Sequence, residues 1–256
     1  PMYYIKNGLK KQWHWLAYLF AAFGVLTVFG TGNATQVNTI TTAIDSALYN
    51  YGVISEQNVS TLNLVIGIIL AVLIGLILLG GIKRIGQVAE KLVPFMAVIY
   101  IILAIGVVIL NYRNIPTVFA SIFKGAFSPA SVTGGAVGSF FMSMKKGVSR
   151  GIFSNEAGLG SAPIAAAAAK TNEPVRQGLV TMTGTFIDTI IVCTLTGLSI
   201  VMMGSYQVKG IEGVQVTTDA FKKGLSFLPA EVSAFILMVC LVFFAFTTIL
   251  GWNYYG

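Results

Sequence analysis

Residues Leu62 to Gly80 read LNLVIGIILAVLIGLILLG, a run of nineteen residues without one charged side chain. About 20 predominantly apolar residues are needed for a helix to cross the hydrocarbon core of a bilayer. Because lipid offers no partner to backbone N–H and C=O groups, such a run is expected to be helical. The alternating ten-residue segments of a membrane β-barrel are absent from the sequence. This stretch therefore predicts a transmembrane helix.

The composition of the whole chain agrees with this prediction. Of its 256 residues 55% are apolar and only 10% are charged, and the mean hydropathy is +0.81. Soluble domains are closer to 45–50% apolar and about 25% charged, and disordered chains need low hydrophobicity with high charge. Both classes are excluded. The net charge of +7 is then explained by loops beside a membrane, and no nucleic-acid partner is predicted.

Other stretches are long and apolar enough to span a bilayer. They are Trp13 to about Gly30, Leu92–Leu110, Gly178–Met203 and Val232–Leu250. Pro94 is expected in the first turn of its span, where a missing N–H costs little. All these features predict an all-α polytopic membrane protein.

Several enzyme and metal-site classes find no support in the sequence. Two cysteines and one histidine make neither a disulfide framework nor a histidine metal cluster. No phosphate-binding Walker loop, GxSxG elbow or HExxH motif is present, which argues against an ATP-driven pump or a hydrolase. We expect no enzymatic activity and no organic cofactor.

Residues 134–170 differ from the other spans, reading GGAVGSFFMSMKKGVSRGIFSNEAGLGSAPIAAAAAK. One interpretation is a polar loop between two short interfacial helices. The other, which we prefer, is a single membrane helix broken near residues 154–160. Unwound backbone is tolerated at membrane depth only where it lines a cavity or is buried in protein. A glycine-interrupted span is also the best sequence indication of a transporter binding site.

Basic residues flank the spans unevenly. Eight Lys and Arg residues lie in 1–12, 81–91 and 170–177. Five lie in 31–61, 111–133 and 204–231. The short loops with more cations are expected in the cytoplasm, which places residues 1–12 there. Six crossings then alternate consistently, provided that the broken segment counts as one.

The predicted break would create a site for a small zwitterion. N–H groups near Gly160 to Pro163, at the start of the second half-helix, favour a carboxylate. Carbonyl groups at the end of the first half-helix favour Na⁺ or an ammonium group. Glu156 would be costly in lipid, so it either faces a cavity or forms an ion pair, with Arg150 as the candidate partner. A purely structural ion pair is an equally good interpretation.

Two further polar positions lie inside apolar spans. Thr247 and Thr248 either bond to carbonyl groups one turn back in their own helix or offer the hard oxygen ligands that Na⁺ prefers. Asp188 is expected to face the bundle interior, as an ion site, a proton site or a hydrogen-bonded structural acid. The residues alone leave these alternatives open.

The stretch RGIFSNEAGLGSAP, from Arg150 to Pro163, resembles the signature of the alanine/glycine:cation symporter family. Pro1 to Ile5 is similar to the end of that family's GGPMYYI motif, and Phe186 to Thr189 is similar to another part of the family. The resemblance covers the whole chain. It implies a leucine-transporter-like fold built from two inverted repeats of five helices, each with a broken first helix.

On that template the chain is one transmembrane domain and an internal fragment of a protein nearly twice as long. Residues 13–133 would form helices three to five of the first repeat. Residues 134–256 would form helices six to eight of the second, with helix six broken near 154–160. Because the broken helix one supplies the other half of the sites, the fragment alone is not expected to transport.

The resemblance also implies sodium-coupled uptake of the small neutral amino acids alanine and glycine across a prokaryotic plasma (inner) membrane. The residues carried over to the amino-acid site are Phe153, Ser154, Asn155, Gly158, Leu159, Gly160 and Trp252. Thr247, Thr248 and the Phe244 carbonyl would bind Na⁺, and Glu156, Arg150 and Asp188 are further polar candidates. The alternatives are proton coupling through Asp188 or Glu156, and a non-transporting membrane scaffold subunit.

Overall fold

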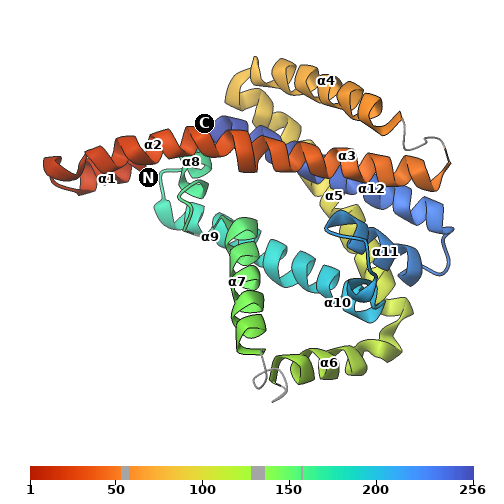
Figure 1. The fold of residues 1–256 in the computed structure, drawn as a ribbon. Coiled ribbons are helices and arrows are strands. Elements are labelled where there is room, and N and C mark those ends of the chain that lie inside the picture. Colours follow the sequence, from red (N-terminus) through yellow and green to blue (C-terminus); the bar gives the residue numbers. More distant parts are fainter. Residues whose placement is uncertain (53–57, 128–135, 157) are drawn as a thin grey trace.

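The computed structural model describes residues 1–52, 58–127, 136–156 and 158–256, and the regular structure in them is helical (Figure 1). The first half contains α1 Met2–Gly8, η1 Lys11–Trp13, α2 Trp15–Thr27, η2 Val28–Ala34, α3 Thr35–Asn50, α4 Val59–Leu78, α5 Gly81–Leu110, η4 Tyr112–Asn114 and α6 Ile115–Phe127. The second half contains α7 Ala136–Asn155, α8 Ala162–Ala166, α9 Pro174–Phe186, η6 Ile187–Cys193, α10 Thr194–Met202, η7 Ser205–Gln207, α11 Val214–Gly224 and α12 Ala230–Tyr255.

Five helical stretches in the described residues are long and apolar enough to cross a membrane. They are Lys11–Tyr49, Val59–Leu78, Gly81–Leu110, Pro174–Met202 and Ala230–Tyr255. The all-helical, polytopic membrane architecture predicted from the composition is thus confirmed at this level. Large apolar side chains on these helices are often exposed, as on α4, which is expected where lipid is the solvent.

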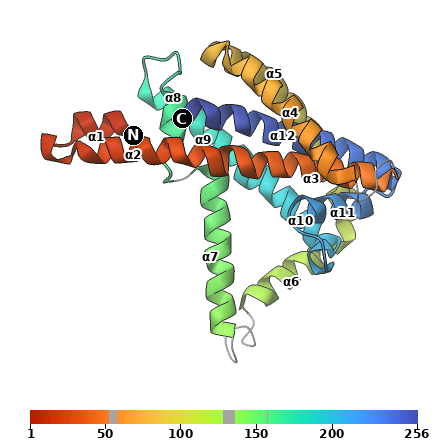
Figure 2. The same ribbon diagram turned by 45° about the horizontal axis from the view of Figure 1, so that its top comes forward.

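The sequence predicts six crossings, and the helix α7 is not among these five. Lys145, Lys146 and Arg150 place three cations in its twenty residues, more than an apolar span carries. In both views α7 projects away from the layer formed by α3 and α12 (Figures 1 and 2). The predicted boundary between the repeats, at residues 133 and 134, lies outside the described residues.

The first span is longer than its predicted limit near Gly30. The helix continues from Lys11 to Tyr49, through the π-helical turn η2 and along α3. Ile40, Ala43 and Ala47 are buried on one face of α3, at the i, i+3, i+7 spacing of an amphipathic helix. Hydropathy alone predicts a loop over residues 31–50, because the many threonines and asparagines lower it, although the apolar positions keep helical periodicity.

The charged stretch 81–91 is predicted as a loop, but it is the first part of α5. Pro94 therefore lies in the interior of a thirty-residue helix and not in its first turn. A proline there has no N–H to donate to the carbonyl group four residues earlier. The prediction is wrong because it places the helix start at the first apolar residue, whereas charged side chains are tolerated on a helix beyond the hydrocarbon core.

The core is organised around α12, which lies beside α3 and also contacts α5 and α11 (Figure 1). Phe221 of α11 and Leu225, directly after this helix, are fully buried and pack with Val107 of α5 and Leu237 of α12. The Asn111 amide donates to the Gly224 carbonyl oxygen at 3.0 Å and ties the end of α5 to α11. The segment 204–231, predicted as a loop, thus contains a helix that is part of the core.

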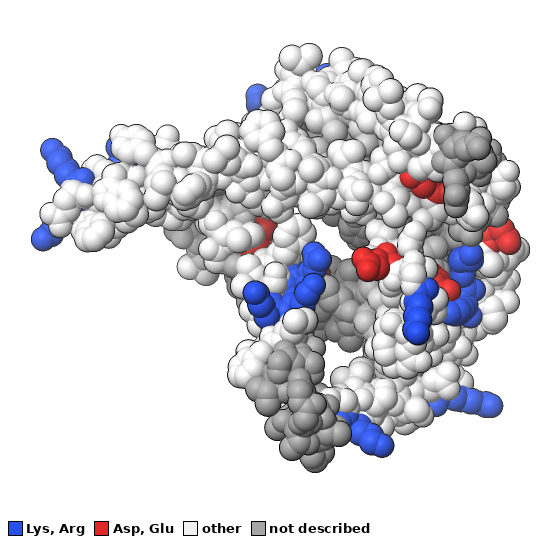
Figure 3. All heavy atoms as spheres, viewed as in Figure 1, with Lys and Arg blue, Asp and Glu red and all other residues white. Residues whose placement is uncertain are grey.

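The charged groups are confined to a few places on a largely uncharged surface. Lys and Arg gather at the free end of the α1–α2 arm and along α7 (Figure 3). An ion pair joins Lys223 to Asp219 at 2.6 Å, and both residues belong to α11. This pair therefore stabilises one helix and does not tie two helices together.

The closest approach between the first span and α12 requires a glycine. A Cβ atom on Gly32 would lie 2.5 Å from Trp252 Cβ, whereas one on Gly30, in the same π-helical turn, would meet nothing within 4 Å. We expect Gly32→Ala to destabilise the full-length protein by about 1–3 kcal/mol through overpacking. Gly30→Ala is the matched control. Melting temperatures in detergent test this, and equal melting of the two variants would contradict the close packing.

Candidate functional site

The helix α7 ends inside the glycine-rich motif. Its last residue is Asn155, and the next helix, α8, begins at Ala162. Between them Glu156, Gly158 and Gly160 have φ angles of 52°, 77° and 80°. Such left-handed backbone is easy for glycine and uncommon for other residues. Two glycines therefore allow the chain to leave the helical path here, and Glu156 adopts a conformation that few side chains favour.

Glu156 is held by its own segment and not by Arg150. Its carboxylate accepts a hydrogen bond at 2.7 Å from Oγ of Ser161, a buried serine next to the start of α8. Tyr255, at the end of α12, interacts electrostatically with the same carboxylate. The predicted Glu156–Arg150 ion pair is absent from the described residues, where Arg150 is exposed on α7. A helix that ends at Asn155 carries the two side chains apart.

Two hydrogen bonds attach the end of α7 to η6. Ser154 Oγ donates to Asp188 Oδ2 at 2.5 Å, and Thr189 Oγ1 donates to Asn155 Oδ1 at 2.8 Å. The two bonds join consecutive residues of α7 to consecutive residues of η6. Together they fix both the position and the rotation of the end of α7 relative to η6. The π-helical winding of η6 is a local irregularity of a kind often found at functional sites. Asp188 is thus hydrogen-bonded to a residue of the motif.

An open pocket of about 390 Å³ lies at this junction. Its lining residues are Ser154, Asn155, Glu156, Ala162, Ala165, Ala166, Gln177, Thr181, Gly184, Thr185, Asp188 and Tyr255. Four predicted polar site residues are therefore brought together: Ser154, Asn155, Glu156 and Asp188. Hydroxyl, amide and carboxylate groups share this lining with three alanines and one glycine, a combination that suits a small polar ligand.

Other residues predicted for the amino-acid site do not line this pocket. Phe153 and Leu159 are exposed large side chains, and Gly158 and Gly160 shape the backbone of the break. Trp252 is buried against Gly32 and makes an edge-to-face contact with Tyr255, with ring centroids 5.4 Å apart. Tyr255, which is not predicted from the sequence, lines the pocket one turn beyond Trp252. Its position three residues after Trp252, on the same face of the helix, is the sequence feature that could have indicated it.

The candidate sodium ligands lie elsewhere on α12. Thr248 Oγ1 donates to the Phe244 carbonyl oxygen at 2.8 Å, and Thr247 Oγ1 donates to the Phe243 and Phe244 carbonyls at 3.0 Å. These are the bonds within one helix that form the alternative interpretation of the pair. Tyr255 follows Thr248 by seven positions, which corresponds to about 10 Å along the helix, so the threonine pair lies away from the pocket.

A reciprocal amide pair, not predicted from the sequence, joins the first span to α12. Asn253 Nδ2 donates to Asn33 Oδ1 at 2.9 Å, and Asn33 Nδ2 lies 3.4 Å from Asn253 Oδ1. The polar stretch around Asn33 is thus used for helix–helix contact, where amides serve in place of apolar packing.

We expect Thr189→Val to loosen the attachment of α7 to η6. Valine keeps the shape of the threonine side chain but leaves Oδ1 of the Asn155 side chain without its donor. The loss of this hydrogen bond should lower the stability by about 1 kcal/mol. Thr183→Val is the control, because the Thr183 hydroxyl donates only within its own helix, to the Leu179 carbonyl. Hydrogen exchange of peptides covering residues 151–161 should be faster in Thr189→Val. Equal exchange in both variants would show that the bond does not hold the break.

Comparisons with known proteins agree on one family. The family model described as "Sodium:alanine symporter family" matches residues 1–256. An uncharacterized transporter of Haemophilus influenzae is 50% identical over 100% of this chain and 53% of its own length. The sodium/alanine symporter AgcS of Methanococcus maripaludis is 43% identical over 100% of this chain and 53% of its own length. The probable sodium/glutamine symporter GlnT of Bacillus subtilis is 38% identical over 100% of this chain and 49% of its own length.

The chain spans about half the length of the curated relatives it matches. The match extends over the whole chain, including the glycine-rich motif whose geometry is described above. The chain therefore belongs to the sodium:alanine symporter family, a family of transporters rather than enzymes.

Proposed function

We propose that the full-length protein couples the uptake of a small neutral amino acid, alanine or glycine, to the entry of Na⁺. The observation that carries this proposal is the break between Asn155 and Ala162, which opens a polar pocket where the family motif lies. Family membership supports sodium and alanine as transported species. Interrupted helices at a binding site are a recurring device of secondary transporters.

The expected binding mode follows from the ends of the interrupted helix. The last carbonyl groups of α7 carry partial negative charge and favour an ammonium group or Na⁺, whereas N–H groups after the break favour a carboxylate. This half of the proposed amino-acid site includes Ser154 and Asn155, which line the pocket at the break. Four further residues of the same motif do not line that pocket and are proposed to contact the amino acid in the full-length protein: Phe153, Gly158, Leu159 and Gly160. The other half would come from a broken helix outside this chain, in a leucine-transporter-like arrangement of two inverted repeats.

The proposed sodium site uses Thr247, Thr248 and the Phe244 carbonyl oxygen. Both hydroxyl oxygens lie within 3.0 Å of that carbonyl oxygen, and such hard oxygens are suitable ligands for Na⁺. A bundle that rocks around the central site, driven by the Na⁺ gradient, would then give alternating access. Residues 1–12 are proposed to face the cytoplasm of a prokaryotic cell.

The alternative of a non-transporting scaffold subunit would need a continuous helix through residues 154–158. The end of α7 at Asn155 favours the transporter. Proton coupling through Asp188 or Glu156 is the second candidate, because both carboxylates line the pocket.

Replacement of Na⁺ distinguishes the two kinds of coupling. In proteoliposomes containing the full-length protein, alanine uptake at fixed pH should be lost when choline replaces Na⁺. Uptake that persists without Na⁺ and follows a pH gradient would instead establish proton coupling.

Thr248→Ala should raise the Na⁺ concentration for half-maximal alanine uptake by about tenfold, the effect of losing one contact to a charged ligand. Thr183→Ala, which removes a hydroxyl bonded within α9, should leave that concentration unchanged. An unchanged sodium dependence in Thr248→Ala would remove this residue from the sodium site.

Trp252 is proposed to limit the size of the transported side chain. Trp252→Ala should allow valine and leucine to compete with labelled alanine for uptake, because the indole ring and its packing on Gly32 are lost. Phe235→Ala, an exposed aromatic on the same helix, is the control. If the order of competing amino acids stays the same in both variants, Trp252 does not limit the size of the transported side chain.

A further inference from the structure

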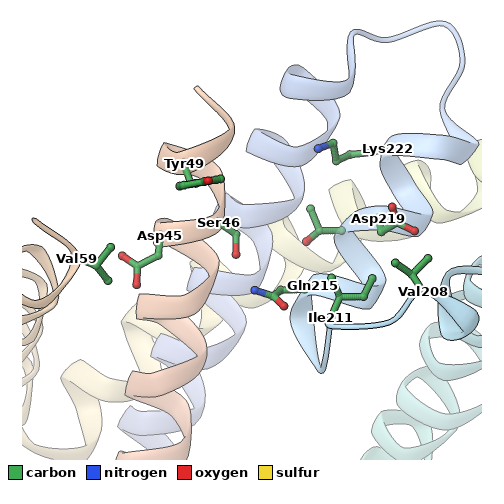
Figure 4. Close-up of a pocket in the computed structure, with 10 residues that line it drawn as sticks. Asp45, Ser46, Tyr49, Val59, Val208, Ile211, Gln215, Asp219 and Lys222 are labelled. Carbon is green, nitrogen blue, oxygen red and sulfur yellow. The ribbon is translucent and has the colours of Figure 1, made fainter. Parts of the chain in front are cut away.

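A second pocket of about 390 Å³ lies between the C-terminal half of α3 and the segment that leads into α11 (Figure 4). It is lined by Asp45, Ser46, Tyr49, Val59, Val208, Ile211, Gln215, Thr218, Asp219 and Lys222. Apolar walls with a few polar groups are the usual composition of a small-molecule site. None of these residues belongs to the motif or to the proposed sodium site.

The two carboxylates of this pocket differ in their surroundings, because Asp219 has a cationic partner and Asp45 has none in the described residues. Asp219 accepts a hydrogen bond from Lys223 at 2.6 Å. Burial raises the pKa of Asp219, but the hydrogen bond and the positive charges of Lys223 and Lys222 outweigh it and keep the pKa below its ordinary value. Oδ1 of Asp45, in contrast, is buried and has no hydrogen-bond partner among the residues that the structure describes. A buried carboxylate oxygen without a donor is costly.

A second acceptor without a donor lies close by along α4. Oδ1 of Asn63 is also buried and finds no hydrogen-bond partner in the described part of the chain. Asn63 does not itself line the pocket, but it follows the lining residue Val59 by one helical turn, on the same face. Figure 4 shows the Asp45 side chain extending from α3 toward Val59. Acceptors of this kind call for a ligand that donates hydrogen bonds and carries positive charge, and a primary ammonium group does both.

The position of the pocket is informative as well. Its lining residues lie within 45–49, at Val59 and within 208–222. These positions belong to the stretches that the Lys and Arg distribution places on the side opposite to residues 1–12. On the proposed orientation it faces the outside of the cell, from which the substrate arrives. The pocket at the break is lined by other helices, α7 to α9 and the end of α12.

We propose that this pocket is an external binding site for the amino acid, with Asp45 receiving its ammonium group. The inference rests on the proposed uptake function and adds a second, earlier binding step to it. Val59, Val208 and Ile211 supply apolar surface for a small side chain. Asp219 stays neutralised by Lys223 and takes no part in holding the ammonium group.

Transport kinetics of the full-length protein in proteoliposomes test the assignment. Asp45→Asn should raise the KM for alanine about tenfold or more, the effect of losing one charge-assisted hydrogen bond, and should leave the maximal rate nearly unchanged. Asp219→Asn is the matched control from the same pocket and should change the KM less than twofold. Equal KM values for Asp45→Asn and the wild type would overturn the proposal.

A labelling experiment gives a readout that does not need transport. Gln215→Cys is made in a background without Cys193 and Cys240, with Asp45 intact, and is labelled from outside by a charged thiol reagent. Alanine and the simple probe methylammonium should both slow the labelling, and adding Asp45→Asn should abolish this protection. The proposal would be overturned if only Na⁺ slowed the labelling, or if neither alanine nor methylammonium slowed it.

The two experiments separate this inference from the proposed function. If the protein takes up no alanine but alanine still slows labelling of the Gln215→Cys variant in an Asp45-dependent manner, symport fails and the external site stands. If uptake is normal but neither the KM nor the labelling depends on Asp45, symport stands and the external site fails.

Discussion

The structure depends on one constraint, the absence of hydrogen-bonding partners in lipid. Each backbone N–H and C=O at membrane depth must find a partner within the protein, which explains the long uninterrupted helices α4, α5 and α12. Where the chain leaves the helical path, the surrounding residues must therefore supply hydrogen bonds to the backbone groups that lose their helical partners. The chain departs at Glu156 to Ser161 and, more mildly, in the π-helical turns η2 and η6.

At each of these irregular segments, neighbouring residues supply hydrogen bonds or pack a side chain against the irregular backbone. At the break, Ser161 bonds to Glu156, and the Ser154 and Asn155 side chains are held by η6. At η2, Gly32 admits the side chain of Trp252 from α12. Polar side chains and small residues thus add to the apolar contacts between α5, α11 and α12, because burial of apolar surface alone gains little between helices surrounded by lipid.

Much of this could be predicted from the sequence, because hydropathy depends on local composition. The class of fold, the apolar spans and the position of the glycine-rich motif follow from residues read in order. Helix ends were predicted less well. The first span continues to Tyr49, and Pro94 lies inside α5, because polar residues are tolerated in a helix wherever a neighbour or water receives them. The prediction of a Glu156–Arg150 pair assumed a geometry that the left-handed backbone at Glu156 does not provide.

The amino-acid sequence is sufficient to identify a helical membrane protein of a symporter family and the motif that interrupts its helices. Those properties are set by composition and by a contiguous run of residues. Which distant residues meet is set by the packing of the helices: Ser154 with Asp188, Asn33 with Asn253, and Tyr255 with the pocket at the break. Packing also leaves Oδ1 of Asp45, in a second pocket, without a hydrogen-bond donor among the described residues. Such pairings depend on how helices pack, and packing joins residues that no local pattern connects.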